Sequence, residues 1–360
     1  MVAYIHKRTV EQKRWLDAET FNAGVALCQM IPGATAMQVA AYVGLSTRGV
    51  IGAAASFIGF GLPAFLLMLL FAAVYASTHT LPVVIAAFSG LQVIVVAIVA
   101  NATLSFGKTT LRNRKHYAIG GVAAVLFGLN ANPILVILLA AVEGLAFLQP
   151  KPPVPHDVRS STPMPPTTKP LLFLLTTTAL GFLALLVFAP VLFDLAALFF
   201  RIDLLAFGGG FASVPLMFHE VVEVRQWLDG PTFLNGIVLG QVTPGPIVIT
   251  ATFVGYLLYG LWGGLLATIS IFLPSFMVLV GLAPHFDRLR VSPAFNKIIG
   301  GVLCSFVGLL LTVTLRFAGD VQWNLPLGLL AGAALMALLL KVDILWVVVA
   351  GTVTSVILFR

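Results

Sequence analysis

Charged side chains are scarce in this 360-residue chain: Asp, Glu, Lys and Arg together make up 9% of it. A soluble domain typically carries about 25% charged residues, because it has to cover its surface with polar groups. With 59% hydrophobic residues and a mean hydropathy of +1.05, this chain cannot do so. The composition therefore excludes an ordinary soluble protein and indicates a membrane protein.

Cysteine is almost absent as well, since Cys28 and Cys304 are the only two and both lie within apolar runs. This excludes a disulfide framework and a thiolate metal site. We expect neither a metal nor a cofactor, and no motif indicates a catalytic residue. The net charge of +7 does not indicate nucleic acid as a partner, because cytoplasmic loops of membrane proteins carry excess Lys and Arg.

Alternating ten-residue segments are also missing, which argues against an outer-membrane barrel. Long apolar runs follow one another instead, and each can cross a hydrocarbon core ~30 Å thick as a helix. Examples are Val50–Tyr75, Val83–Thr103, Leu171–Ala189 and Leu261–Leu282. The sequence predicts an all-α polytopic membrane protein.

The two halves of the chain resemble each other. Residues 10–17 (VEQKRWLD) align with 222–229 (VEVRQWLD), and the match continues through Gln29 and Gln241 to Pro32-Gly33 and Pro244-Gly245. Matches at Trp, Gln, Pro and Gly are not explained by shared hydrophobicity, so the pattern indicates a duplicated unit.

The repeat predicts three parts. Residues 1–149 form the N-terminal repeat, which lacks the opening helix that precedes Phe207 in the second copy. Residues 150–170 contain eight prolines and form a linker without a core of its own. Residues 171–360 form the C-terminal repeat with one connecting helix.

Residues 20–44 and 232–255 each contain a Pro-Gly break and allow two readings. Each is a kinked spanning helix in a parallel duplication, or a re-entrant hairpin in an inverted one. With hairpins, and with the N-terminus and the linker in the cytoplasm, only Arg201, Arg225, Arg316 and Arg360 of the 20 basic residues lie outside. The positive-inside rule favours this second reading, two inverted-topology repeats with Pro/Gly-broken hairpins.

A broken helix presents free backbone N–H groups and the positive end of a helix dipole, which together attract anions. We expect three such breaks to bind a small oxyanion with help from neutral side chains. The candidate residues are Gln29, Pro32, Gly33, Thr35, Gln38, Gly208, Gly209, Gly210, Ser213, Gln241, Thr243, Pro244, Gly245 and Thr250. Gln29 and Gln241 have an equally good alternative role in hydrogen bonds between helices.

Three carboxylates beside the breaks, Glu11, Glu220 and Glu223, are candidates for proton coupling or gating. The competing interpretation is interfacial anchoring together with Trp15 and Trp227, because Trp favours the headgroup level. Within the apolar runs themselves, Glu143 is the clearest carboxylate.

The motif Phe207-Gly-Gly-Gly210, followed by Glu220, Trp227 and residues 241–246 (QVTPGP), resembles the chromate ion transporter family. Residues 29–34 (QMIPGA) and 42–44 (YVG) resemble its N-terminal repeat. The resemblance implies a secondary transporter that exports chromate across the bacterial inner membrane, driven by the proton motive force, with sulfate as a competitor. In this family the first hairpin often reads Pro-Gly-Pro, where this chain has Ala34.

Two other functions remain open from the residues alone. One is transport of another small anion. The other is a membrane-embedded lipid-phosphate hydrolase, which needs a general base and a cationic clamp that residues near Pro32 and Pro244 do not provide. The expected partners are the oxyanion and the lipid bilayer, and the sequence leaves open whether the chain forms a homodimer.

Overall fold

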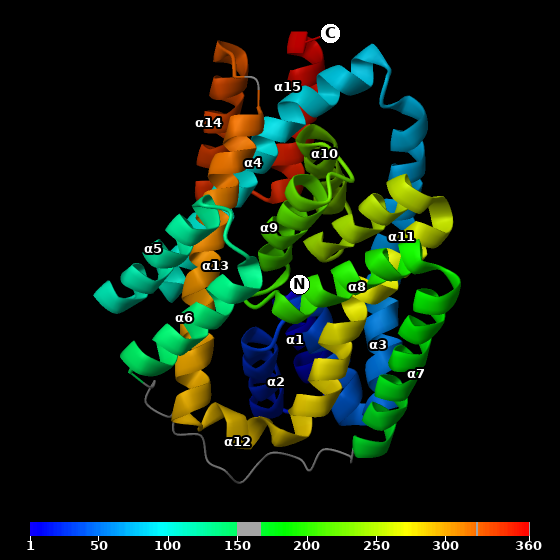
Figure 1. Cartoon of the computed structure of the whole chain (residues 1–360), viewed down its shortest axis with the longest axis vertical. Helices are drawn as coiled ribbons and strands as arrows, with labels where there is room; N and C mark the ends of the chain where they lie inside the picture. The colour runs from blue at the N-terminus through cyan, green and yellow to red at the C-terminus, as the bar shows by residue number, and fades with distance from the viewer. Residues whose placement is uncertain (150–166, 322, 360) are drawn as a thin grey trace.

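The computed structural model of the chain describes residues 1–149, 167–321 and 323–359, and every regular element in these ranges is helical (Figure 1). The first half contains α1 (Val2–His6), η1 (Lys7–Gln12), α2 (Ala18–Met30), α3 (Thr35–Thr78), α4 (Pro82–Thr110), α5 (Arg114–Gly128) and α6 (Pro133–Phe147). The second half contains α7 (Thr168–Phe188), α8 (Pro190–Leu205), η2 (Gly210–Ala212), α9 (Ser213–Phe218), η3 (His219–Val224), α10 (Gly230–Val242), η4 (Ile247–Ile249), α11 (Thr250–Leu282), η5 (Ala283–His285), α12 (Phe286–Arg290), α13 (Pro293–Asp320), α14 (Leu325–Leu339) and α15 (Ile344–Phe359).

Five helical stretches of the described chain are long and apolar enough to cross a membrane. They are α3, α4, α7, the stretch Ile247–His285 around α11, and α13. None of the 18 residues in the most apolar window of α7 is buried, and lipid suits such an exposed apolar surface. The chain is a multi-pass helical membrane protein, as the composition predicts.

Helix α2 and the first part of α3 fold back on each other around Pro32-Gly33. A Cβ atom placed on Gly24 would lie 2.2 Å from the ring of Tyr42, although 18 residues separate the two positions. In a continuous helix these residues would be about 27 Å apart. The break therefore produces a hairpin.

The same geometry recurs around Pro244-Gly245, where a Cβ atom on Gly236 would lie 2.5 Å from the ring of Phe253. Helices α3 and α11 then bend sharply in equivalent places. Arg48 has φ −138° and ψ 21°, Tyr259 has φ −137° and ψ 25°, and each is followed by a glycine with positive φ. Each bend separates a short first limb from a long second one.

The segments before the two hairpins are also alike. Elements η1 and η3 are both π-helical turns, and Arg14 and Gln226 follow them with φ of 51° and 52°. Asp17 and Asp229 then cap α2 and α10, each accepting a hydrogen bond of 2.8 Å from the backbone N–H three residues later. Aligned residues thus adopt the same local structure, because they carry the same capping and turn chemistry.

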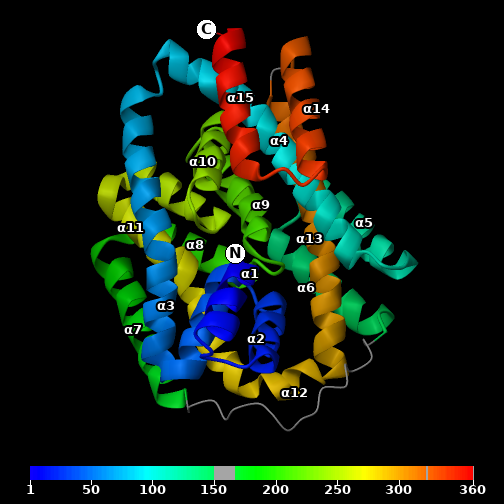
Figure 2. The same ribbon diagram turned by 180° about the vertical axis from the view of Figure 1, so that it is seen from behind.

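The two hairpins lie in different parts of the molecule. Figures 1 and 2 show α2 in the lower part and α10 in the upper part, with the long helix α13 running beside both. Helix α13 packs against α4, α5 and α6, and α11 packs against α3 and α8.

Most of the expected linker, residues 150–166, lies outside the described residues. Its last part does not belong to a linker: Thr168–Pro170 form the first turn of α7. A proline is compatible with the first turn of a helix, because the N–H group that it lacks has no helical partner there.

Candidate functional site

The three expected breaks contact one another. The backbone N–H of Gly33 donates a hydrogen bond of 3.0 Å to the carbonyl oxygen of Ala206, just before the glycine turn. A Cβ atom on Gly209 would lie 3.5 Å from Oγ1 of Thr35, and one on Gly210 would lie 3.4 Å from Cγ2 of Ile247. The structure therefore places residues of both hairpins against the turn 207–210.

Glycine is required at several of these positions. Gly33, Gly208 and Gly209 have φ of +109°, +91° and +93°, a region that other residues rarely adopt. The site around Gly33 is also crowded, since a Cβ atom there would lie 2.2 Å from Cβ of Ser275. These glycines let backbone segments approach each other closely.

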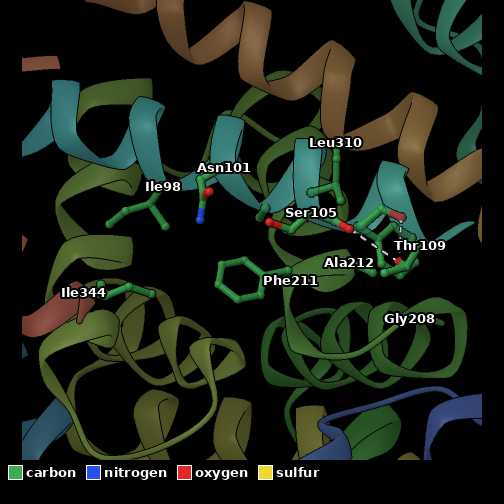
Figure 3. Close-up of a pocket in the computed structure, with 11 residues that line it drawn as sticks. Ile98, Asn101, Ser105, Thr109, Gly208, Phe211, Ala212, Leu310 and Ile344 are labelled. Carbon is green, nitrogen blue, oxygen red and sulfur yellow. Dashed lines mark hydrogen bonds between the residues drawn. The ribbon is translucent and has the colours of Figure 1, made fainter. Parts of the chain in front are cut away.

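A cavity of about 370 Å³ lies beside the glycine turn (Figure 3). Helix α4 contributes Asn101, Ser105 and Thr109, which are four residues apart and therefore share one helix face. Gly208, Phe211 and Ala212 come from the opposite side, as Figure 3 shows. The remaining lining residues are Ile98, Ala102, Phe106, Leu310 and Ile344.

The chemistry of this cavity suits a small anion that has to be released again. Its lining residues carry one amide and two hydroxyl groups but no charged side chain. An amide N–H or a hydroxyl O–H can donate to an oxyanion. The Thr109 hydroxyl already donates to the carbonyl oxygen of Phe106 over 2.9 Å, so Asn101 and Ser105 are the available side-chain donors. Neutral donors in an otherwise apolar cavity orient a ligand. They do so without the strong attraction that a cationic side chain would exert on an anion.

Several expected ligands instead hold the breaks in shape. Ser213, Thr243 and Thr250 each donate a hydroxyl hydrogen bond to the carbonyl oxygen three residues earlier, over 2.6 to 2.8 Å. Gln38 is fully buried and donates from Nε2 to the carbonyl oxygen of Pro32 over 2.5 Å. The single hydroxyl protons of Ser213, Thr243 and Thr250 are engaged with backbone, so these residues support the breaks and have no proton left for a ligand, while Gln38 uses one of its two amide N–H groups.

The two glutamines of the repeat have different environments. Gln29 is exposed, so the structure does not bring it to the cavity. Gln241 is half-buried, and its Nε2 atom is buried without a hydrogen-bond partner among the described residues. Of the two, only Gln241 has a buried donor group that a ligand could use.

The three candidate carboxylates lie away from the cavity. Glu11 is exposed and lies 3.3 Å from a ring nitrogen of His6. Glu220 accepts from Arg201 and from Arg225, and Arg225 also bonds Asp194. These ion pairs hold η3 against α8.

Glu223 lines a separate cavity of about 730 Å³ together with His219, Arg316 and Asp320. Arg316 donates to the Glu223 carboxylate and to the carbonyl oxygen of Phe127. Partial burial alone would raise the pKa of Glu223, but His219 and Arg316 outweigh it and lower the pKa. Glu223 is thus an ion-paired carboxylate that links η3 to α13.

Sequence reasoning missed two features of the site. One is the polar face of α4. The sequence signals it by three polar residues at a spacing of four, Asn101, Ser105 and Thr109. The other is Asp203, which the structure buries completely in α8 beside Gly33, whereas Glu143 is only half-buried. The available signal was an acidic residue in the apolar stretch before the glycine turn.

Comparison with known proteins identifies the family. The chain matches the family described as chromate transporter over residues 1–145 and 193–356. It is 41% identical over 359 residues to the uncharacterized transporter MJ0718 of Methanocaldococcus jannaschii, covering 98% of this chain and 88% of that protein. It is 29% identical to the chromate transport protein of Cupriavidus metallidurans, covering 95% and 83%.

A shorter relative matches only one part of the chain. The uncharacterized transporter YwrA of Bacillus subtilis is 37% identical over 34% of this chain and 69% of that protein. No solved structure matches the chain. Since members of the matched family are transporters, the lipid-phosphate hydrolase alternative is set aside. The chain belongs to the chromate transporter family.

Proposed function

We propose that this chain exports chromate across the plasma membrane as a secondary transporter driven by the proton motive force, with sulfate as a competitor. The observation that carries the proposal is the cavity beside the glycine turn, which is lined by neutral donors, while the turn itself contacts both hairpins. Chromate and sulfate are tetrahedral dianions of similar size, so donors that suit one also suit the other.

In the proposed architecture the two halves are inverted repeats, and their hairpins enter the membrane from opposite sides. The matched backbone geometry of Arg14 and Gln226, and of Arg48 and Tyr259, supports the duplication. The positions of α2 and α10 in Figures 1 and 2 support opposite entry. Transporters of this type bind substrate near the midplane, where broken helices meet.

In the proposed mechanism the dianion occupies the cavity between α4 and the glycine turn. Asn101, Ser105 and backbone N–H groups of the turn donate to its oxygens. The two hairpins then rock relative to the long helices and open the cavity to either side in turn. The glycines at Gly33, Gly208 and Gly209 let the breaks remain in contact while they move.

Transport of labelled chromate into inverted membrane vesicles tests the proposal. We expect energised vesicles that contain the chain to accumulate chromate, sulfate to reduce the uptake, and a protonophore to abolish it. Vesicles with Gly209→Val, which forces a branched residue into a positive φ, serve as the matched negative control. Chromate uptake that persists without a proton motive force would refute the energy coupling, and absence of uptake would refute the substrate.

A further inference from the structure

Asp203 is a fully buried carboxylate in the last turn of α8. Its Oδ2 atom accepts a hydrogen bond of 2.7 Å from the backbone N–H of Ser275. Its Oδ1 atom has no partner among the described residues. A charge in such a place is unfavourable, and ionisable residues inside membrane proteins mark functional sites for that reason.

A purely structural role accounts for only half of this arrangement. Ser275 follows Pro274, a proline inside α11 that cannot donate a helical hydrogen bond, and Asp203 Oδ2 accepts from the backbone N–H of Ser275. A neutral Asn would satisfy it equally well through its carbonyl oxygen. The hydrogen bond to Ser275 therefore accounts for Oδ2, but it explains neither why the residue is ionisable nor why Oδ1 has no partner among the described residues.

The surroundings place Asp203 next to the first break. Ser275, which bonds Asp203, also packs against Gly33, and Nε2 of Gln38 would lie 3.0 Å from a Cβ atom on the same glycine. The Oε1 atom of Gln38 is a second buried acceptor without a described partner. Asp203 Oδ1 and Gln38 Oε1 are thus two acceptors without a donor at one break. Protonation of Asp203 would supply a donor there, because it turns a carboxylate oxygen into an O–H group.

No basic group compensates the carboxylate within the described part of the chain. The helices packed against α8 are α7, α9 and α11. Their ionisable side chains are Lys169, which is exposed, and Tyr256 and Tyr259 of the first α11 limb, while α9 has none. The ionisable side chains of the adjacent hairpin α2–α3 are Glu19, Cys28, Tyr42, Arg48 and Tyr75. Within α8, Arg201 is engaged with Glu220.

From these contacts we propose that Asp203 takes up a proton when a divalent oxyanion occupies the neighbouring site. The step is a linked equilibrium in which one proton from solution converts the carboxylate to the acid while one dianion enters, and no bond within the anion changes. Removal of the carboxylate charge relieves its repulsion of the dianion. The anion brings two negative charges and the proton one positive charge, so loading adds one net negative charge to the site, and a membrane potential that is negative inside drives this charge outward. This inference rests on the proposed function.

Proton uptake on anion binding is the direct measurement. Purified protein in nanodiscs, in weakly buffered and weakly alkaline solution where chromate is a dianion, is mixed with chromate while the pH is recorded. Wild type is expected to take up about one proton per bound anion, and its affinity is expected to fall ~tenfold per pH unit in that range. Asp203→Asn should bind chromate without proton uptake and with an affinity that does not depend on pH.

Asp194→Asn is the control, because Asp194 lies on the same helix but is half-exposed and paired with Arg225. It should behave as wild type. Equal proton uptake by wild type and Asp203→Asn would overturn the inference, as would chromate binding that requires Na⁺ in place of a proton. If Asp203→Asn does not fold, Asp203→Glu should retain uptake with a displaced pH midpoint, and an unchanged midpoint would overturn the inference.

The two proposals fail in distinguishable ways. If wild type binds no chromate at all, the proposed substrate is wrong. If wild type binds chromate and transports it in vesicles but takes up no proton on binding, chromate transport stands and the role of Asp203 is wrong.

Discussion

The ring of Tyr42 packs against the backbone of Gly24 across the first hairpin, so closely that a single methyl group on the glycine would overlap the ring. Gly236 and Phe253 have the same relationship in the second hairpin. In both pairs an aromatic ring occupies the space that a glycine leaves free, and this close approach lets two short helical limbs run side by side.

The first prediction concerns these pairs. Gly24→Ala and Gly236→Ala should each lower the unfolding free energy by about 1–3 kcal/mol, because the added methyl overpacks the hairpin. Gly181→Ala, in an exposed part of α7 with no neighbouring atom near the new methyl, is the control and should be neutral or stabilising. Thermal unfolding in detergent, followed by circular dichroism, measures the effect. Equal behaviour of all three variants would contradict the hairpin packing.

The second prediction concerns the bend of α11. Gly260 has φ +62° and open space around its Cα, so Gly260→Ala adds backbone strain without a clash and should destabilise the fold by about 1 kcal/mol. Gly332→Ala, inside α14 and equally open, should instead stabilise by about 0.5–1 kcal/mol through helix propensity. A stabilising effect at Gly260 would mean that the bend is absent in the membrane.

The third prediction tests the polar face of α4. Asn101→Ala removes one donor from the cavity and should raise the chromate concentration for half-maximal transport about tenfold, the equivalent of one hydrogen bond. Ser89→Ala is the matched control, because Ser89 lies on the same helix outside the cavity and donates to the Ile85 carbonyl. Uptake kinetics in inverted vesicles provide the readout. An unchanged chromate concentration for half-maximal transport in Asn101→Ala would show that Asn101 does not contact the anion.

The fourth prediction follows from Glu223 and Arg316. Arg316→Ala removes the guanidinium partner of a partly buried carboxylate, which then keeps only His219, and should lower the unfolding free energy by about 1–3 kcal/mol. Because the pKa of Glu223 is lowered in the folded protein, the stabilisation is present above the ordinary Glu range and is lost as the pH falls through the folded value. Wild type should therefore lose more stability on acidification than Glu223→Gln. A double-mutant cycle without coupling energy would show that the ion pair contributes nothing.

The fifth prediction tests the proposed inverted topology. A cysteine at Thr80→Cys should react with a membrane-impermeant maleimide in intact cells, whereas Val291→Cys should react only after the membrane is permeabilised. Both positions are exposed, and the native Cys28 and Cys304 are buried, so background labelling should be low. Labelling of both positions from the same side would contradict inverted repeats.

Much of the fold could be predicted from the sequence. The apolar runs at 50–75 and 261–282 lie in α3 and α11, because hydropathy over some 20 residues suffices to specify a membrane helix. Pro32-Gly33 and Pro244-Gly245 interrupt helices where expected, since proline and glycine act on the backbone locally. Which candidate residues bind the anion stays a prediction, but Gln29 is exposed, and Ser213, Thr243 and Thr250 donate to their own backbone, which the sequence did not indicate.

The sequence by itself determined the membrane class, the helical content and the positions of the breaks, because each depends on residues close together in the chain. Only the tertiary structure decided that Gly33 bonds Ala206, that α4 turns Asn101 and Ser105 toward the glycine turn, and that Asp203 is enclosed beside Ser275. These relationships join residues many positions apart. They depend on how long helices pack against one another, which local hydropathy and backbone preference do not specify.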